Sequence, residues 1–426
     1  MKKTRSPAGT GFPSRGRGIP TVVIAACILF SCAAGGETAI LWTDRDEFAI
    51  YAEYFNAGQD RYKVETRYFD SPAQRLTGTG ENPDIVVGSW LKSASTRTLF
   101  RPLDGFLRND TIPPEGFYAR ILQLGNIDNK QYLLPVSFNI PALIFFRGRD
   151  EPPSNPFTIG FEEMKRRGRE YNVEQKGVFT RMGFSPLWND QFLFVTAALF
   201  NSSFREAAPL AWDAQALERS MSFVRDWIAE ANSSVQAVED FSFKYFYDPP
   251  AKLVLSGRIL FAYMESDALF TLMAERRSDL DFRWIAENDT IPMIEGTVYY
   301  GIYKKGKAKK AAAAFTRWFF QAETQRMLLE RSRDNRMLET GFGIGGGFSA
   351  MRQVTEQIFP QFYPILLGHM PPKDFLSPPH ILPRNWTAIK EKVILPYLHE
   401  RVRSEDRNEI RPLERRIADW YRLNRE

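Results

Sequence analysis

The side chains with the clearest chemistry are aromatic rings near carboxylates, amides or hydroxyls at the ends of short apolar runs. An aromatic face packs on a flat apolar surface of a guest molecule, while nearby polar groups fix the orientation of the guest. This combination is typical of reversible ligand binding. The candidate ligand-binding residues are Trp42, Asp44, Trp90, Asn139, Trp188, Asn189, Glu265, Ser266, Asp267, Tyr299 and Tyr300.

These candidates also have structural interpretations that the sequence leaves open. A buried tryptophan is more often part of a core than a binding platform. Asp44 and Asp267 precede helical patterns and are equally suited to be helix N-caps, because a carboxylate there accepts hydrogen bonds from free backbone N–H groups.

Motifs for catalysis are missing from the sequence. His369, His380 and His399 stand among prolines, without an i, i+4 metal pair or a nearby thiol. There is no G-x-S-x-G nucleophile motif and no G-x-x-x-x-G-K-[ST] phosphate loop, and Gly341–Gly347 lack the spacing of a phosphate cradle. We therefore predict a binding protein with no metal, cofactor or catalytic residue. Two carboxylates that converge in space, as in a glycan-cleaving enzyme, are the remaining catalytic alternative.

The N-terminus has the layout of an export signal. Residues 1–31 contain no acid. Their basic residues come first, and the apolar run Thr21–Phe30 comes after these. That run is shorter than the ~20 apolar residues of a membrane-spanning helix, so we expect cleavage. Leu29, Ser31 and Cys32 resemble a bacterial lipoprotein processing site, where a diacylglycerol alkylates the cysteine, although Phe30 departs from the pattern. An ordinary secretory signal with an incidental cysteine is the alternative.

Charge and cysteine content fit an exported body without a nucleic-acid partner. The chain has 56 Lys and Arg against 51 Asp and Glu. The excess of five basic residues lies in the export signal, so basic and acidic residues are equal in number in the mature chain. Its net charge therefore gives no sign of a nucleic-acid-binding surface. Because the only other cysteine, Cys27, lies in that signal, the mature chain has no internal disulfide. We expect acylated Cys32 to anchor the protein to the membrane on its periplasmic side.

The pattern along the chain predicts an α/β protein with two lobes. The mature chain exceeds the ~250–300 residues at which a single core stops growing. Short β patterns alternate with helical ones over Thr38–Trp42, Asp46–Asn56, Tyr62–Phe69, Ser71–Gly78 and Asp84–Gly88. Such alternation predicts parallel strands with helices on both faces, and ligands at the carboxyl ends of the strands.

Several motifs, in their order along the chain, resemble the extracellular solute-binding proteins of ABC importers, in particular the sugar-binding group that includes maltose-binding protein. Asn82–Trp90 and Leu99–Asp104 are similar to the family's PDI strand and its G-x-L-x-P-L-D passage. Pro152–Met164 is similar to a PP-x-TW-x-E helix start, from which Phe157 and Ile159 depart. Further similar passages are Lys130–Asn139, Leu255–Met264, Lys309–Leu328 and Gly341–Arg352, the last without the family's proline.

The resemblance implies a periplasmic-binding-protein-like (type II) fold, with two lobes around a cleft that closes by hinge motion. Lobe 1 is expected over residues 32–138 and 290–340, and lobe 2 over residues 139–289 and 345–402. Crossings between them are expected near Ser137–Pro141, Ala286–Pro292 and Gly341–Gly347. Residues 403–426 are expected to form a charged helical tail that docks on the parent domain or on a permease.

The family further implies a monomer whose partners are a small-molecule solute, here expected to be a carbohydrate, and the transmembrane subunits of an ABC permease. One alternative is an envelope interaction lipoprotein that keeps the fold without transport. A cleft filled by Phe, Trp and Arg side chains would favour that alternative.

Overall fold

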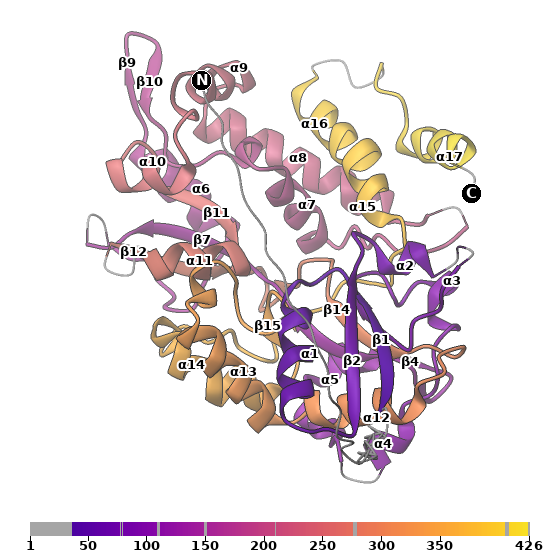
Figure 1. The fold of residues 1–426 in the computed structure, drawn as a ribbon. Helices are drawn as coiled ribbons and strands as arrows, with labels where there is room; N and C mark the ends of the chain where they lie inside the picture. Colours follow the sequence, from indigo (N-terminus) through magenta and orange to yellow (C-terminus); the bar gives the residue numbers. More distant parts are fainter. Residues whose placement is uncertain are drawn as a thin grey trace, which may run out of the picture. The chain divides into compact units, whose positions relative to one another are not determined.

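Two β-sheets, each assembled from distant parts of the chain, organise the protein (Figure 1). The structure is a computed structural model that describes residues 36–424 apart from residues 77, 79, 109–110, 149–150, 209, 276–278 and 405–408. The predicted export signal and Cys32 lie outside the described residues.

The larger sheet has six strands in the order β15-β6-β14-β3-β1-β2. Strand and helix alternate at its start, as predicted, through β1 (Glu37–Thr43), α1 (Glu47–Ala57), β2 (Tyr62–Tyr68), α2 (Pro72–Arg75) and β3 (Ile85–Gly88). β1 pairs in parallel with β2 and β3. Three later strands complete the sheet in antiparallel pairing, namely β6 (Leu134–Phe138), β14 (Val298–Ile302) and β15 (Phe348–Ser349). This sheet and its helices are termed lobe 1.

Lobe 1 has a two-sided core because its central strands are apolar on both faces. Residues 85–87 of β3 are fully buried. Helix α12 (Lys309–Phe319) lies beside α1, where Phe315 packs edge-on against Phe55 with 5.3 Å between ring centroids. These two helices therefore cover the same face of the sheet.

The smaller sheet has four strands in the order β11-β7-β12-β8 and forms the centre of lobe 2. Its strands are β7 (Pro141–Phe146), β8 (Thr158–Ile159), β11 (Phe261–Glu265) and β12 (Leu280–Ile285). β8 pairs with β12 in parallel, but β7 is antiparallel to β11 and β12. The parallel pairing expected over residues 38–88 is present among β1, β2 and β3, but it does not extend to this sheet. Local periodicity does not encode the direction in which a chain returns after a long helical excursion.

That excursion supplies the helices of lobe 2. They are α6 (Phe161–Tyr171), α7 (Asp190–Leu199), α8 (Ala214–Ala231), α9 (Val235–Tyr245) and α10 (Pro250–Ser256), with α11 (Ser266–Glu275) following β11. Phe161, Phe192 and Trp227 pack edge-on against one another beneath α6, α7 and α8. This aromatic cluster gives lobe 2 a core of its own.

Three segments link the two lobes. Residues 139–140 join β6 to β7, and residues 286–297 join β12 to β14, where we expected two crossings. The third link, residues 350–385, leaves β15 and contains β16 (Leu376–Ser377), which pairs in parallel with β13 (Ile291–Pro292) of the second link. The Ile294 N–H donates to the Asn139 carbonyl at 2.9 Å, so the first and second links are also bonded. We term these three links the waist.

The glycine-rich segment 341–347 belongs to lobe 1 in the structure. Gly343, Gly345 and Gly346 have φ values of 66°, 56° and 75°, which glycine adopts without steric cost. The Ser137 hydroxyl donates to the Gly345 carbonyl at 2.9 Å, and β15, directly after the segment, pairs with β6. The third link between the lobes therefore follows β15 rather than coinciding with the glycines.

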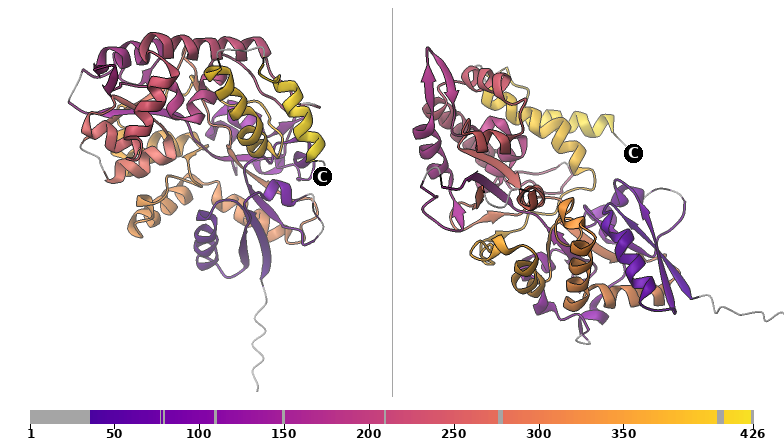
Figure 2. Two further views of the ribbon diagram at one scale, coloured as in Figure 1. Left: turned by 90° about the horizontal axis from the view of Figure 1, so that it is seen from above. Right: turned by 60° about the vertical axis from the view of Figure 1, so that its left-hand side comes forward.

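The C-terminal helices pack on lobe 2 (Figure 2, yellow beside magenta). α15 (Trp386–Ile389) continues through a π-helical turn over residues 390–394 into α16 (Leu395–Arg403). Arg401 of α16 pairs with Glu218 of α8. α17 (Leu413–Leu423), within the expected tail, buries Leu413 and Ile417.

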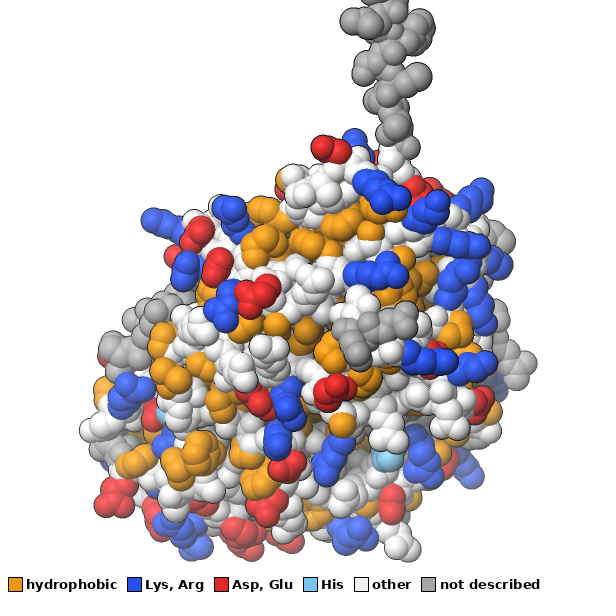
Figure 3. All heavy atoms as spheres, turned by 90° about the horizontal axis from the view of Figure 1, so that it is seen from below, with side chains coloured by type: hydrophobic (Ala, Val, Ile, Leu, Met, Phe, Trp, Pro, Cys, Tyr) orange, Lys and Arg blue, Asp and Glu red, His pale blue; other side chains and the backbone are white. Residues whose placement is uncertain are grey.

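The surface carries mixed charge. Basic, acidic and apolar side chains are interspersed on the face drawn in Figure 3, as expected for a sequence with 56 Lys and Arg and 51 Asp and Glu. Among the described residues no helix is both long and apolar enough to cross a bilayer.

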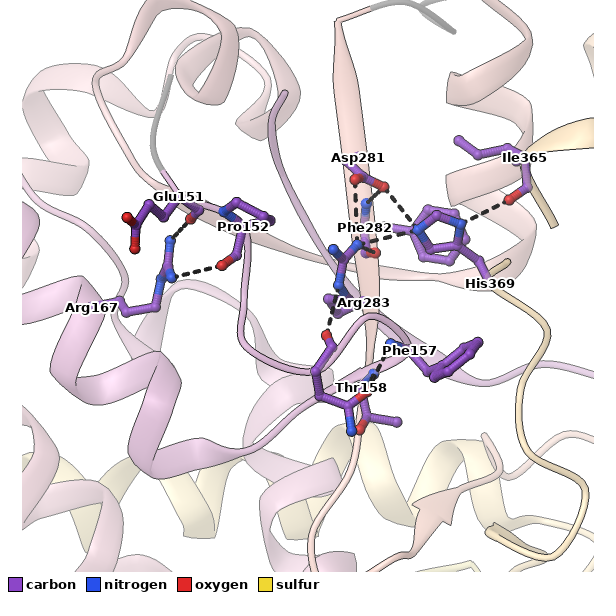
Figure 4. Close-up of polar contacts among 11 residues, drawn as sticks. Glu151, Pro152, Phe157, Thr158, Arg167, Asp281, Phe282, Arg283, Ile365 and His369 are labelled. Atoms are coloured by element: carbon purple, nitrogen blue, oxygen red, sulfur yellow. Dashed lines mark hydrogen bonds and ion pairs between the residues drawn. The ribbon is translucent and has the colours of Figure 1, made fainter. Parts of the chain in front are cut away.

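A buried polar cluster fastens the third link to lobe 2 (Figure 4). His369 of the link lies 3.2 Å from both the Asp281 carboxylate and the Arg283 guanidinium of β12. Arg283 is only 5% exposed, and it also approaches the Asp281 carboxylate to 3.4 Å. The hydrogen bond from His369, a backbone N–H and the Arg283 charge together lower the pKa of Asp281 to about 2, against the opposing effect of burial.

We expect Asp281→Asn to lower the free energy of unfolding at pH 7 by about 1–2 kcal/mol. Because the folded-state pKa is lowered, the stabilisation is present above the ordinary value of 3.8 and is lost as the pH falls through about 2. Urea unfolding at pH 7 and pH 3 measures this difference. Asp334→Asn is the control, since Asp334 pairs with Arg333 at the surface, and it should change stability by less than about 0.5 kcal/mol. Equal effects of the two variants at pH 7 would contradict the assignment.

Candidate functional site

Two hollows are lined by residues of both lobes. The first, termed the indole pocket, has a volume of about 570 Å³. Lobe 1 contributes Trp90, and the other lining residues used below are Trp188, Asn189, Gln191, Glu265, Glu295, Trp386 and Lys390. The second, termed the loop pocket, has a volume of about 540 Å³ and is lined by Arg45, Glu47 and Gly341 of lobe 1 and by Asp267 and Thr271 of lobe 2.

Trp90 and Trp188 line the indole pocket from opposite lobes. Trp90 follows β3 with a φ of 64°, an uncommon backbone conformation for a bulky residue. Trp188 ends a short 3₁₀ turn and stacks on Phe241 of α9, with 5.7 Å between centroids and 21° between planes. Its indole N–H has no hydrogen-bond partner among the described residues. Both rings are half-buried, which leaves part of each surface for a guest.

The polar part of the indole pocket is organised around Glu295. Gln191 donates to the Glu295 carboxylate at 3.1 Å, and the Lys390 ammonium donates to both Glu295 and Gln191. The Glu295 and Lys390 side chains are 7% and 12% exposed. The ammonium also lies 4.5 Å from the centroid of the Phe194 ring. This arrangement holds a carboxylate, an amide and an ammonium in fixed positions at the pocket.

Glu265 adds an unusually weak acid at the end of β11. Burial raises its pKa to about 7; the negative charges of Asp267 and Glu295 act in the same direction, and Lys390 opposes them. At neutral pH this carboxyl is therefore present in both forms. It either donates to or accepts from a hydroxyl group of a guest.

The raised pKa of Glu265 predicts a pH-dependent stability. Glu265 binds its proton more tightly in the folded protein than in the unfolded chain. The resulting stabilisation is complete below pH 4.5 and is lost as the pH rises through about 7. Glu265→Gln should remove about 1–3 kcal/mol of the difference in unfolding free energy between pH 5 and pH 8. Urea unfolding at the two pH values tests this, and an unchanged difference in the variant would contradict it.

Asn189 has a structural role as well as a place in the pocket wall. It is the N-cap of α7, and its side-chain oxygen accepts from the Phe192 N–H at 3.1 Å. This bond fixes the start of the helix that carries Gln191.

Asn139 lies in the waist, and Ser266, the first residue of α11, is bonded to it. The Asn139 amide donates to the Gly346 carbonyl at 2.8 Å, and its side-chain oxygen accepts from the Ser266 hydroxyl at 2.6 Å. Ser266 is fully buried, and its hydroxyl also accepts from the Ile140 N–H at 3.2 Å. These bonds tie the first link to the glycine-rich segment and to α11, so the observed role of both residues is to join the lobes.

Asp267 lines the loop pocket, whereas Asp44 lines a neighbouring hollow that shares Arg45, Glu47 and Gly341 with it. Asp44 accepts from the Ser89 N–H at 3.0 Å and lies 3.3 Å from Arg45, while burial raises its pKa. It does not cap α1, whose N-cap position is Asp46. Asp267 stands in the first turn of α11, where its carboxylate accepts from the next N–H, of Ala268, at 2.7 Å.

Trp42, Tyr299 and Tyr300 are core residues, and none of them lines either pocket. Trp42 is 4% exposed and packs edge-on against Phe69. The Tyr299 hydroxyl donates to the Ile121 carbonyl at 2.9 Å, and the Tyr300 hydroxyl bonds to Thr316 at 2.7 Å. The structural interpretation holds for these three, because strands in the middle of a covered sheet bury the side chains of both faces.

The sequence analysis missed Gln191, Glu295, Trp386 and Lys390. They come from a helix, a link and the C-terminal segment, and only the fold brings them together. The one signal in the sequence was that Gln191 follows the predicted site residues Trp188 and Asn189 by two or three positions. Among the described residues no group of His, Cys, Asp and Glu is arranged to hold a metal ion.

Solved structures with the same fold come from several bacteria. An ABC substrate-binding protein of Listeria monocytogenes in complex with cycloalternan has a TM-score of 0.62 at 12% identity, over 90% of this chain and 97% of that chain. A sugar transporter of Rhizobium etli in an open conformation has a TM-score of 0.61 at 14% identity, over 90% and 97%. The maltose/maltodextrin-binding domain of Bdellovibrio bacteriovorus bound to maltotriose has a TM-score of 0.56 at 14% identity, over 91% and 100%. No curated protein matches the chain in sequence.

Fold and site together define a two-lobed α/β ligand-binding protein. Residues 42–326 match the family model described as bacterial extracellular solute-binding protein, and the chain belongs to that family. The resemblance drawn from the motifs and the predicted periplasmic-binding-protein-like fold are both confirmed.

Proposed function

We propose that the protein is a lipid-anchored, extracytoplasmic receptor that captures a small carbohydrate between its lobes and delivers it to an ABC permease. The observation that carries the proposal is the indole pocket, to which both lobes contribute an aromatic face. Trp90 and Trp188 stack on the apolar faces of a sugar, and Gln191, Glu265 and Glu295 bond to its hydroxyl groups.

Capture requires that the guest stabilise a closed arrangement of the lobes, since equal affinity for open and closed states shifts nothing. A sugar held by Trp90 on lobe 1 and by Trp188 on lobe 2 meets this condition. The waist supplies the hinge, because its three links are the covalent connections between the lobes in the described chain. The closed receptor then offers both lobes to the permease.

A carbohydrate is supported by the guests of the structural neighbours, which include cycloalternan and maltotriose. Titration calorimetry of the purified protein with malto-, manno- and cyclic oligosaccharides tests the class. We expect at least one to bind with micromolar affinity or better, and small-angle scattering to show compaction at saturation. Binding by none of the panel, or saturation with an unchanged radius of gyration, would overturn the proposal.

Membrane attachment has its own test. We expect Cys32→Ser to move the protein from the membrane fraction to the soluble fraction without a change in solute affinity, because the thiol is the acyl acceptor. Mass spectrometry of the N-terminal peptide should find diacylglycerol on Cys32 of the wild-type protein and no diacylglycerol on the Cys32→Ser variant. An unmodified cysteine in membrane-bound protein would contradict the anchor.

The alternatives are separated by simple observations. An open hollow of about 570 Å³ between the lobes favours capture over an interaction protein with a filled cleft. The matched family is one of binding proteins, not enzymes. Incubation of the protein with each oligosaccharide that it binds should therefore release no shorter sugar. Release of more molecules of shorter sugar than there are protein molecules would establish the glycan-cleaving alternative.

A further inference from the structure

A third hollow, the waist pocket, lies on the other side of the second link from the indole pocket. It has a volume of about 170 Å³. Its lining is mixed. The apolar part includes Phe194, Val195 and Phe204 of lobe 2, Met293 of the second link, and Pro378 and Leu382 of the third link, and the polar part includes Glu287, Asn288 and His380. Ile294 and Glu295 line both this pocket and the indole pocket, so a single stretch of chain separates the two.

The walls of the waist pocket belong to the moving parts of the hinge. The Met293 N–H donates to the Ser377 carbonyl at 2.8 Å, which bonds the second link to the third beside the pocket. The third wall is the end of α7, the helix whose other end carries Gln191. A change in the angle between the lobes has to pass through these links, and it therefore changes the shape of the pocket.

The size and chemistry of the pocket select a class of guest. An apolar cavity of about 150 Å³ accommodates one benzene ring, so the waist pocket has room for one six-membered ring. Ser202 lines it, is 1% exposed, and has a hydroxyl without a partner among the described residues. The residues on either side of it, Asn201 and Ser203, have φ values of 64° and 52°. A buried hydroxyl without a partner is costly unless a guest supplies the missing bond.

We propose that the waist pocket is a second, regulatory binding site for a small apolar ring that carries a hydroxyl group, such as a phenol or an aryl alcohol, and that its occupancy shifts the balance between open and closed lobes. The ring packs among the apolar walls, and its hydroxyl pairs with Ser202. The effect on closure rests on the proposed function, whereas binding at the waist pocket does not.

Binding is tested with phenol and toluene on the full protein in the absence of sugar, by ligand-observed NMR titration. We expect phenol to bind more tightly than toluene, and Ser202→Ala to weaken phenol about fivefold and toluene not at all. Ala198→Trp, which places an indole in the pocket, should abolish binding of both. Ala229→Trp, at an exposed position of α8, is the matched control and should leave binding unchanged. Equal phenol binding by the Ala198→Trp and Ala229→Trp variants would overturn the site.

Regulation is tested by measuring the radius of gyration and, for a sugar that binds, its affinity with and without saturating phenol. By linkage, phenol should change the sugar affinity by the same factor by which the sugar changes the phenol affinity. A factor of one, with phenol shown to be bound and the radius unchanged, would refute the regulatory role and leave the capture proposal intact. If neither the parent protein nor any variant binds a sugar, the capture proposal is refuted instead.

Discussion

Lys390→Met should lower the free energy of unfolding by about 3–5 kcal/mol, the largest effect that we expect from a single substitution. The substitution leaves the Glu295 carboxylate 93% buried without its counter-charge, because the Lys390 ammonium is the cation paired with it in the described residues. Gln191 and Trp386 are its other partners, at 3.1 and 3.5 Å, and they carry no charge. Urea unfolding at pH 7 is the measurement.

Two controls separate loss of the ion pair from loss of packing. Lys310→Met removes an exposed ammonium from α12 and should change stability by less than about 0.5 kcal/mol. The double variant Lys390→Met with Glu295→Gln removes both charges, so it should recover at least half of the loss. A double variant that is as unstable as Lys390→Met alone would show that packing of the lysine stem, rather than an unpaired carboxylate, is responsible.

Trp188→Ala should weaken solute binding about 30-fold, or about 2 kcal/mol, because it removes the aromatic face that lobe 2 presents to the pocket. It also removes the stack on Phe241, so stability falls as well. Trp188→Phe keeps a ring but no N–H donor, and an intermediate affinity is expected. Titration calorimetry measures both affinities.

The matched control for this prediction is Trp318→Ala. Trp318 is a half-buried indole on α12 that packs against Phe55 at 5.4 Å and lines neither pocket. It should lower stability to a similar degree without a change in affinity. Wild-type affinity in the Trp188→Ala protein would remove Trp188 from the site.

The sequence was most informative where short-range pattern and motif order act together. The alternation of β1, α1, β2, α2 and β3, and the apolar face of α12, follow from local periodicity. The order of the motifs identified the family. The direction and pairing of the strands in lobe 2 did not follow from the local pattern, because β7 meets β11 and β12 only after long excursions of the chain.

The candidate site shows the same limit at the level of single residues. Trp90, Trp188 and Glu265 were found because each ends a strand or a short turn that the pattern reveals. Trp42 and Tyr299 satisfy the same local rule, yet they point into the core, which only the pairing of their strands decides. Lys390 carries no local mark, since its partners Gln191 and Glu295 lie about a hundred residues or more away in sequence.

The position of β14 has a consequence for biosynthesis. This strand lies between β3 and β6, so two early strands of the sheet stay unpaired along one edge until residues 298–302 have been delivered. A nascent chain shorter than this presents open strand edges and cannot complete lobe 1. Because this central strand arrives late, we expect polypeptides truncated before residue 298 to leave lobe 1 incomplete and to be substrates for proteolysis.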